Sequence, residues 1–309
     1  MCTAIAYRGK SFCFGRNMDY EYGFDERIVI MPRNYKLTAS NGEVICDHFA
    51  MIGTAVVDNE YPLYFDAMNE KGLCIAGLNF VGNAVYFGEK AEKYNIAQYE
   101  LIPMLLAQCA SISDLRQLLK KINITNKPFS EQYAPAQLHW LAADKENCIV
   151  IESTAEGLKV YDNPIGVLTN NPPFPIQYAS LEEYRHLSPK NSKSDDSVCK
   201  RDYSRGMGTN GLPGGLSSQA RFIRGAFMNT HSELGGACSD VQQVFHILDT
   251  VKQVRGCCVT ETGELEYTIY SSCCNADEGS YSVVTYGDRQ IKEYNLNSVD
   301  LSSDGLYIY

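Results

Sequence analysis

The order of strand and helix signals along the chain is the feature that most restricts its fold. Apolar runs separated by Arg8-Gly9-Lys10 and by Glu70-Lys71-Gly72 predict two hairpins in the first third of the chain. A pair of helical segments follows, then more strands, a second helix pair and closing strands. Paired helices, rather than one helix after each strand, disfavour a Rossmann or barrel fold. We therefore predict an α+β fold, a four-layer αββα sandwich with two antiparallel sheets between helix pairs.

Hydrophobic periodicity and turn residues predict the individual segments. The expected strands are residues 3–7, 11–16, 27–31, 63–69, 73–80, 137–142, 148–153, 158–161, 165–170, 265–272 and 281–286. The expected helices are 99–109, one capped by Ser113 with a stripe of Leu115, Leu118, Leu119 and Ile122, a short one at 177–187, one starting at Ser218, and one opened by the capping box Ser239-Asp240-Val241-Gln242. No repeat or linker is found, so residues 1–309 are predicted to form one domain. A polar loop at about 188–215 is the candidate for an assembly arm.

Composition and charge restrict the partners of this chain. Its 309 residues carry a net charge of −10, which argues against nucleic acid or an anionic membrane as the main partner. No apolar run approaches the roughly 18 residues that a membrane span needs, so no membrane insertion is expected. The first residues, from Met1 to Arg8, lack the features of a signal peptide. A cytoplasmic location is therefore expected.

Twelve cysteines raise the question of disulfides or metal binding. In a long chain without an export signal, reduced thiols are the better interpretation. The adjacent pairs Cys257-Cys258 and Cys273-Cys274 suggest a metal site, but no C-x-x-C or H-x-x-x-H spacing supports it. Buried small apolar side chains on strands are the favoured interpretation of both pairs. Neither a metal nor a cofactor is expected.

Other familiar motifs are absent or in the wrong context. Residues 206–211 match G-x-G-x-x-G, but no strand precedes them and Pro213 falls where a helix would begin. No P-loop and no G-x-S-x-G nucleophile elbow is present. His139 in an apolar strand and His246 on a helix are interpreted as structural, although a Cys–His dyad stays open.

Cys2 follows the initiator methionine directly and is small enough for that methionine to be removed. The residue would then carry both a thiol nucleophile and a free α-amine, whose ordinary pKa of about 7.7–8.0 suits a base. N-terminal catalysis of this kind needs no histidine. Cysteine at position 2 alone is weak support, because many proteins carry it by chance.

The motifs that surround Cys2 and follow it along the chain make the argument specific. They are Met1-Cys2-Thr3-Ala4, Phe14-Gly15-Arg16-Asn17-Met18-Asp19, Asn69-Glu70-Lys71-Gly72-Leu73, Ala76-Gly77-Leu78-Asn79-Phe80, Gly166-Val167-Leu168-Thr169-Asn170, Gly211-Leu212-Pro213-Gly214 and Ala220-Arg221-Phe222-Ile223-Arg224. With these motifs, and over nearly its whole length, the sequence resembles the choloylglycine hydrolase family of bile salt hydrolases and penicillin V acylases.

The resemblance implies a set of catalytic residues. Cys2 would be the nucleophile, with Asp19 polarising its amine and Arg16 favouring the thiolate. Asn79 and Asn170 match positions that stabilise the oxyanion or orient the substrate amide. Arg221 would complete the charge network. A buried ion pair is the structural alternative for both arginines and is compatible with catalysis.

The resemblance also implies the reaction and the assembly. The thiolate would attack the amide of a glycine- or taurine-conjugated bile acid, and water would release the free bile acid from a thioester. The family fold is the same αββα sandwich. A homotetramer, built partly by the arm near 188–215, is also implied.

Substrate choice is predicted from a few positions. Bile salt hydrolases tend to carry Asn where penicillin V acylases carry Tyr, so Asn79 favours bile salts. Met18, Phe65, Tyr133 and Leu141 are candidate pocket residues, with plain core as the alternative for them. Residues 55–60 differ in length from relatives, and Val56 or Val57 replaces an aromatic pocket residue.

Three alternatives remain open. The chain could be a penicillin V acylase, or it could transfer the acyl group to other amines, since any amine that outcompetes water can capture a thioester. A different class is a non-catalytic bile-acid or lipid binder. Retention of Met1 would favour a non-catalytic binder, because the α-amine of Cys2, which would be the base, is then bound in a peptide bond.

Overall fold

The computed structural model describes residues 1–191, 205–233 and 238–309. The first large sheet contains β1 (Cys2–Arg8), β2 (Phe12–Tyr20), β14 (Val167–Leu168), β15 (Cys258–Val259), β16 (Leu265–Asn275), β17 (Ser280–Thr285) and β18 (Lys292–Asn295). The second contains β3 (Arg27–Met31), β6 (Met51–Asp58), β7 (Tyr61–Asn69), β8 (Cys74–Asn79), β11 (Leu138–Ala143), β12 (Cys148–Thr154), β13 (Gly157–Asp162) and β19 (Tyr307–Ile308).

Short strand pairs and helices complete the described chain. The small pairs are β4 (Leu37–Thr38) with β5 (Val44–Ile45), and β9 (Tyr94–Ala97) with β10 (Ile122–Thr125). The α-helices are α1 (Leu101–Gln108), α2 (Ile112–Leu119), α3 (Phe174–Ser180), α4 (Ser218–His231) and α5 (Asp240–Asp249). Short 3₁₀ turns are η1 (Gln98–Glu100), η2 (Leu181–Tyr184), η3 (Met207–Thr209) and η4 (Leu296–Ser298).

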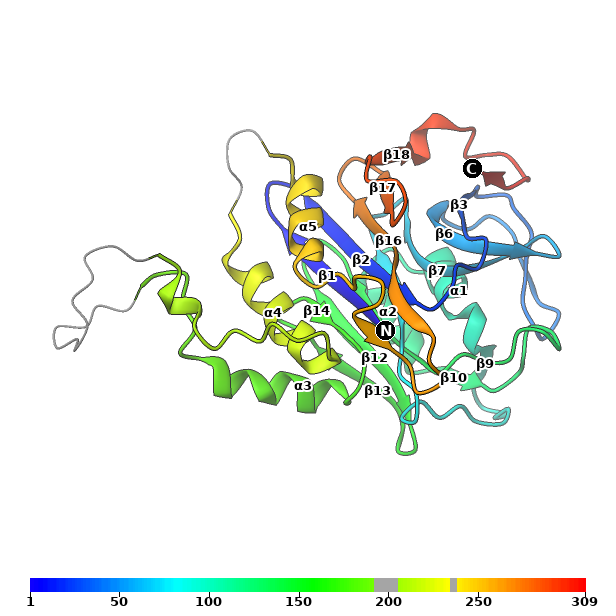
Figure 1. The fold of residues 1–309 in the computed structure, drawn as a ribbon. Coiled ribbons are helices and arrows are strands. Elements are labelled where there is room, and N and C mark those ends of the chain that lie inside the picture. Colours follow the sequence, from blue (N-terminus) through cyan, green and yellow to red (C-terminus); the bar gives the residue numbers. More distant parts are fainter. Residues whose placement is uncertain (192–204, 234–237) are drawn as a thin grey trace, which may run out of the picture.

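Two sheets stacked face to face form the centre of the molecule (Figure 1). The first has the order β14-β1-β2-β16-β17-β18, with β15 beside β16, and the second has the order β13-β12-β11-β8-β7-β6-β3-β19. Their inner faces share one core, which includes Phe14 and Tyr281 from the first sheet and Ile52 and Leu141 from the second. The predicted pair of antiparallel sheets in an α+β fold is confirmed.

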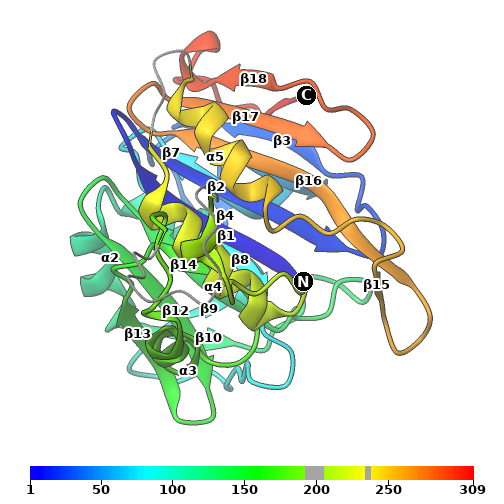
Figure 2. The same ribbon diagram turned by 60° about the vertical axis from the view of Figure 1, so that its left-hand side comes forward.

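Helix pairs cover the two outer faces of the sandwich. Helices α4 and α5 lie on the first sheet, against β1, β2 and β16 (Figure 2). Helix α1 packs on β7 and β8 of the second sheet, and its apolar side chains share a core cluster with those of α2. The predicted capping box opens α5, because the Ser239 hydroxyl accepts from Gln242 N while the Gln242 side chain accepts from Ser239 N.

Several predicted boundaries were wrong. Ser111, not Ser113, caps α2, since its hydroxyl accepts from Asp114 N. Ile122 belongs to β10 rather than to the helical stripe. The helix expected at 177–187 begins earlier as α3, with Pro173 at its N-cap and Pro175 in its first turn, and it ends in η2.

Other differences concern strands and the proposed arm. Strand β6 has no expected counterpart, and the strand expected at 165–170 shrinks to β14. Of the polar loop at 188–215, residues 192–204 lie outside the described part. Within the described residues, no helix is long and apolar enough to cross a membrane.

The cysteine pairs differ from each other. Cys273 and Cys274 are buried on β16, where burial raises the pKa of both thiols well above the ordinary value. Cys257 is exposed and Cys258 is partly exposed, so the expected burial is wrong for this pair. All cysteines in the described ranges are free, and no cluster of three or more possible metal-ligating side chains occurs there.

Close packing between β6 and β7 yields a stability prediction. A Cβ atom on Gly53 would lie 2.1 Å from the backbone oxygen of Asp66 and 2.6 Å from Ala67 Cβ. Because backbone cannot move aside cheaply, Gly53→Ala is expected to lower the free energy of unfolding by about 1–3 kcal/mol. Gly88, where a Cβ would meet nothing within 4 Å, supplies the matched Gly88→Ala control, with a change below about 0.5 kcal/mol. Urea unfolding measures both variants, and equal midpoints would contradict the packing argument.

Candidate active site

Cys2 lies at the beginning of β1, in the middle of the first sheet, where it pairs with Met18 of β2. In the same register Ala4 pairs with Arg16. Directly paired residues share a face of the sheet, and side chains alternate along a strand. Cys2, Arg16 and Met18 therefore share the inner face, which looks toward the second sheet.

The inner face holds the Cys2 sulfur in a polar and polarisable environment. The Arg16 guanidinium donates to Cys2 Sγ at 3.3 Å through Nη2 and lies 3.0 Å from the Met18 sulfur. Through Nη1 it also donates to the Phe65 carbonyl at 2.5 Å. Both Cys2 and Arg16 are about 1% exposed. A fixed cation beside a thiol favours the thiolate, the nucleophilic form.

Arg16 forms an ion pair with Asp66 of β7. Asp66 Oδ1 lies 3.5 Å from Arg16 Nη1, and the carboxylate accepts hydrogen bonds from Tyr270 and Tyr281 at 2.6 Å each and from Ser272 at 2.9 Å. Burial, followed by the nearby carboxylate, raises the pKa of both tyrosines well above 10, so their hydroxyls stay protonated and donate. The buried carboxylate is thus fully hydrogen bonded, as its burial requires.

Asp19 lies on the opposite, outer face, beneath α4. Its Oδ1 accepts from the Thr268 hydroxyl at 2.6 Å, whereas Oδ2 lies 4.0 Å from Arg221 Nη1 and has no hydrogen-bond partner among the described residues. Burial raises the pKa of Asp19, and Arg221 and the N-terminal amine act against that rise. Burial lowers the pKa of Arg221, against the effect of Asp19.

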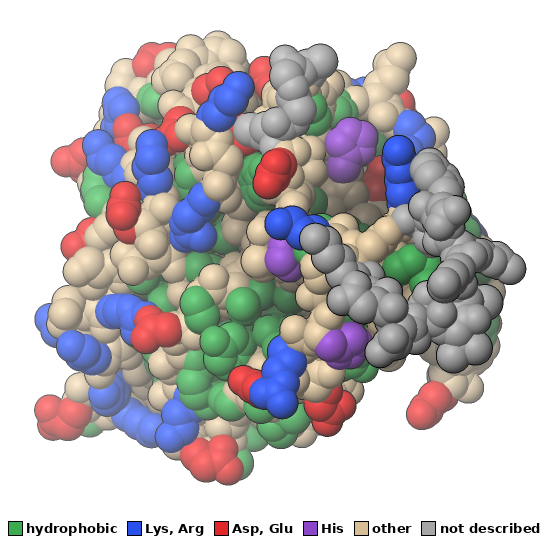
Figure 3. Space-filling model, turned by 90° about the vertical axis from the view of Figure 1, so that its left-hand side faces the viewer, with side chains coloured by type: hydrophobic (Ala, Val, Ile, Leu, Met, Phe, Trp, Pro, Cys, Tyr) green, Lys and Arg blue, Asp and Glu red, His purple; other side chains and the backbone are tan. Residues whose placement is uncertain are grey.

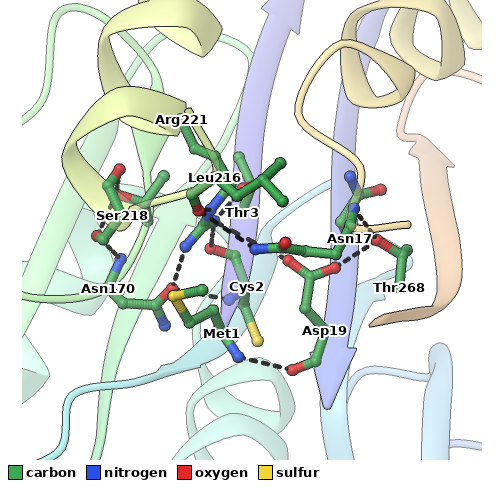
Figure 4. Close-up of polar contacts among 12 residues, drawn as sticks. Met1, Cys2, Thr3, Asn17, Asp19, Asn170, Leu216, Ser218, Arg221 and Thr268 are labelled. Atoms are coloured by element: carbon green, nitrogen blue, oxygen red, sulfur yellow. Dashed lines mark hydrogen bonds and ion pairs between the residues drawn. The ribbon is translucent and has the colours of Figure 1, made fainter. Parts of the chain in front are cut away.

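Arg221 ties the start of β1 to α4 (Figure 4). Its Nη1 donates to the Cys2 carbonyl at 2.5 Å and to the Thr3 hydroxyl at 2.7 Å, its Nη2 donates to Asn170 Oδ1 at 2.8 Å, and its Nε donates to the Leu216 carbonyl at 3.0 Å. Each donor direction is fixed by the planar guanidinium. The backbone of the nucleophile is therefore held rigidly.

The side-chain amide of Asn170 bonds three partners. Its Oδ1 accepts from Cys2 N at 2.8 Å and from Arg221, and its Nδ2 donates to the Asn79 carbonyl at 2.8 Å. The partners fix the orientation of the amide, because a backbone N–H only donates and a carbonyl only accepts. Asn170 thus orients the nitrogen of Cys2 (Figure 4), and one of its two N–H bonds has no partner among the described residues.

Asn79, at the end of β8, differs from Asn170 in that neither N–H bond of its side-chain amide has a partner in the described part of the chain. Its side-chain amide makes no hydrogen bond within the described residues, and Asn79 lines the same cavity as Cys2. An unpaired amide N–H₂ beside a nucleophile is suited to an oxygen on which negative charge develops.

A cavity of about 760 Å³ opens onto Cys2 between the two sheets and the loop at 126–137. Its wall includes three of the four predicted pocket residues, Met18, Phe65 and Tyr133. Leu141 does not line it and instead lies fully buried in the core between the sheets. Val56 lines the cavity, as expected for one of the two valines. Most of the remaining wall is aromatic or aliphatic, so the cavity suits a large apolar group.

Met1 occupies the space in front of the Cys2 backbone nitrogen. Its amine donates to the Asp19 carbonyl at 2.9 Å and forms an ion pair with Glu266 at 2.9 Å (Figure 4 shows the former). Glu266 is about 6% exposed, and its other oxygen has no partner among the described residues. With Met1 attached, the nitrogen of Cys2 is an amide and cannot act as a base.

The structure thus gathers the six predicted catalytic residues around the start of β1, with contributions from β2, β8, α4 and the segment after β14. Sequence reasoning missed Asp66, Thr268, Tyr270 and Glu266. One signal for them exists in the sequence. Asp66 and Glu266 are acidic residues within strands of mostly apolar residues, where a charge needs a partner.

The fold has two sheets between helix layers. A cysteine begins one of the inner strands, and an amide side chain holds its nitrogen. These features define the N-terminal nucleophile class of amide hydrolases. A model of the choloylglycine hydrolase family, described as linear amide C–N hydrolases, matches residues 2–309. The chain belongs to this choloylglycine hydrolase family.

Relatives and solved structures agree with this membership. The chain is 50% identical over 313 residues to the bile salt hydrolase/transferase of Lactiplantibacillus plantarum, covering 100% of the chain and 96% of the relative. It is 37% identical over 319 residues to that of Clostridium perfringens, with the same coverage. A variant of conjugated bile acid hydrolase from Clostridium perfringens superposes with a TM-score of 0.92 at 35% identity, covering 100% of this chain and 96% of the other. Penicillin V acylase from Agrobacterium tumefaciens, at 17% identity and a TM-score of 0.79 over 99% and 90% of the chains, shares the fold.

The Arg16–Cys2 contact predicts a measurable thiol reactivity. Arg16→Leu removes the cation beside Sγ, so alkylation of Cys2 by iodoacetamide at neutral pH should slow by about tenfold. Peptide mapping by mass spectrometry separates Cys2 from the other cysteines. Arg8→Leu is the matched control, because Arg8 is the exposed last residue of β1, the strand that begins with Cys2. In this variant Cys2 should be alkylated at the wild-type rate. An unchanged rate in Arg16→Leu would show that the guanidinium does not activate the sulfur.

Proposed function

We propose that the protein hydrolyses the amide bond of glycine- or taurine-conjugated bile acids, with Cys2 as an N-terminal nucleophile. The observation that carries the proposal is the position of Cys2 in the wall of a largely apolar cavity, with its Sγ hydrogen bonded by Arg16 and the free amide of Asn79 in the same wall. The names of the relatives, bile salt hydrolase/transferase and conjugated bile acid hydrolase, support the substrate.

The mechanism begins with removal of Met1. A free Cys2 amine has more N–H groups than the amide nitrogen, and one of them already faces Asn170 Oδ1. The unpartnered Oδ2 of Asp19 supplies a further acceptor for this amine. Buried acceptors without donors are costly, so the Asp19 network is complete only in the processed protein. Glu266, released from Met1, adds negative charge nearby.

Acylation follows from these positions. The amine of Cys2 takes the thiol proton, the thiolate attacks the acyl carbon, and the Asn79 amide donates to the oxygen that becomes negative. When the C–N bond breaks, the protonated amine gives its proton to the leaving nitrogen of glycine or taurine. The acyl group then remains on Sγ as a thioester.

Deacylation repeats the steps with water. The amine accepts a proton as water attacks the thioester carbon, the C–S bond breaks, and the free bile acid leaves. The acyl group would occupy the cavity beside Met18, Phe65 and Tyr133, whose size suits a steroid nucleus. No residue of this scheme has to move its backbone, since Arg221 and Asn170 fix the start of β1.

Transfer of the acyl group to another amine is a second candidate activity. One contact favours it: the Met1 amine lies between the Glu266 carboxylate and the Asp19 carbonyl, directly beside the Cys2 nitrogen. After Met1 is removed, a primary amine could bind there in place of water. Penicillin V hydrolysis is less favoured, because the likeness to a penicillin V acylase concerns the fold.

We also propose that residues 1–309 form one domain that assembles as a homotetramer in the cytoplasm. The family resemblance supports the assembly. Ile176 and Tyr178 of α3 are exposed large hydrophobic side chains. Figure 3 shows hydrophobic side chains gathered on part of one face of the molecule. Such groups are suited to a contact between subunits.

The nucleophile is tested with Cys2→Ala. The purified wild-type protein should have the intact mass expected after loss of one methionine, and it should release cholate from glycocholate and taurocholate. Cys2→Ala should release none while unfolding at the same temperature as the wild type, and Cys46→Ala, at an exposed free thiol, should retain full activity. Chromatography of the products measures the release. Turnover by Cys2→Ala would contradict the mechanism.

Asn79 tests both the oxyanion donor and substrate choice. Asn79→Ala should lower kcat for glycocholate by about 10²–10³-fold, because one donor to the developing charge is lost. Asn79→Tyr places a ring at the mouth of the site, so the ratio of penicillin V to glycocholate activity should rise. Asn83→Ala, outside the cavity, is the control. If Asn79→Tyr retains full glycocholate activity with an unchanged ratio, Asn79 does not discriminate between the substrates.

A further inference from the structure

One amide side chain in the cavity wall has no part in the scheme above. Gln98 is the first residue of η1, just before α1, and it lines the cavity that opens onto Cys2. It is about 7% exposed. Among the charged and amide side chains in the wall, Arg16 and Gln98 are the two that are more than nine-tenths buried.

The contacts of Gln98 fix the direction of its amide. Its Oε1 accepts from the backbone N–H of Ala136 at 3.1 Å. A backbone N–H can only donate, so the oxygen must face Ala136 and the N–H₂ group must face away from it. Within the described residues, Nε2 has no hydrogen-bond partner, and it is not sealed from the cavity.

The backbone around Gln98 is held in place by Glu100. The fully buried Glu100 carboxylate accepts from Ala97 N at 2.5 Å and from the Ser40 hydroxyl at 2.9 Å. Because these bonds join the turn to a distant segment, η1 cannot easily rotate. The N–H₂ of Gln98 is therefore a fixed donor, already oriented before a ligand binds.

The surroundings of this donor indicate what it binds. The cavity that Gln98 lines also contains Ile102, Phe129 and Trp140, whose side chains carry no acceptor. A ligand that fills the cavity would cover this N–H₂ group, and a covered donor without a partner is unfavourable, so an oxygen of the ligand is its natural partner. Since Gln98 carries no charge, a neutral oxygen such as a hydroxyl suits it better than an ionic group.

The register of β11 and β8 places this donor relative to the reacting bond. Leu138 pairs with Asn79, and Ala136 lies two residues before Leu138, a spacing of roughly 7 Å along an extended chain. Gln98 therefore lies too far along the wall to serve the oxyanion. It faces the part of the acyl group beyond the scissile amide.

We propose that Gln98 determines specificity by donating a hydrogen bond from Nε2 to a hydroxyl group on ring B or ring C of the steroid nucleus. The inference rests on the proposed bile-acid function. A site that holds a substrate hydroxyl with a buried polar group discriminates against analogues without it, because the polar group is then left unpaired. Gln98 thus selects among bile acids by their hydroxylation rather than by their leaving amino acid.

The test compares taurine conjugates that differ only in hydroxyl groups. Taurocholate carries them on rings A, B and C, whereas taurolithocholate carries one on ring A alone. Gln98→Leu should lower kcat/KM for taurocholate about fivefold, mostly through KM, and leave taurolithocholate unchanged, which is the effect of losing one neutral hydrogen bond. Taurochenodeoxycholate and taurodeoxycholate then show whether ring B or ring C carries the contacted hydroxyl.

Two further variants separate specificity from structure. Gln98→Met, closer in shape, should give the same selective loss if Gln98→Leu folds poorly. Gln108→Leu, the same substitution at the exposed end of α1, should leave both substrates unaffected. An equal loss for both conjugates would show that Gln98 only holds Ala136, and no loss at all would likewise overturn the inference. If the wild type hydrolyses no conjugate, the proposed function itself fails.

Discussion

The position of β2 between β1 and β16 is the constraint on which the rest of the site depends. Arg16 and Asp19 are only three residues apart in β2. Because side chains alternate along a strand, Arg16 points to the inner face of the sheet and Asp19 to the outer face. One strand thus supplies both the cation beside the sulfur and the carboxylate that faces Arg221. Cys2 joins the two faces, with its Sγ on one side and its backbone nitrogen held by Asn170.

A bulge in β16 allows one strand to support both faces. The register shifts between Thr268 and Tyr270, so Thr268 bonds Asp19 on the outer face while Tyr270 bonds Asp66 on the inner face. Without the extra residue, positions 268 and 270 would point the same way. Removing Asp66 from water is costly, and three hydroxyl donors offset that cost. The bulge is therefore a functional feature, since it lets a regular sheet hold two separate buried charges.

Much of the sandwich could be predicted, because its signals are local. The hairpin at residues 8–10, the capping box at Ser239 and the apolar stripe of α5 all depend on residues close together in the sequence. Strand β6 and the true start of α3 escaped prediction. Most of β6 is buried on both faces, so its residues do not alternate between apolar and polar, and Pro173 and Pro175 obscure the start of α3. For the site, the catalytic set came from the family resemblance, whereas Asp66 and Gln98 acquire their roles only from partners 204 and 38 residues away.

The two free amides in the cavity are held in place by separate parts of the fold. Asn79 and Gln98 both present an unpaired N–H₂ to the same space, yet different elements hold them. The Asn79 backbone is fixed by Asn170, which is itself bonded to the nucleophile, so any shift in Asn79 also disturbs Cys2. Gln98 is fixed by Ala136 and by the turn that Glu100 holds. Changes at Gln98 can therefore alter which acyl groups are accepted while leaving the geometry around Cys2 intact.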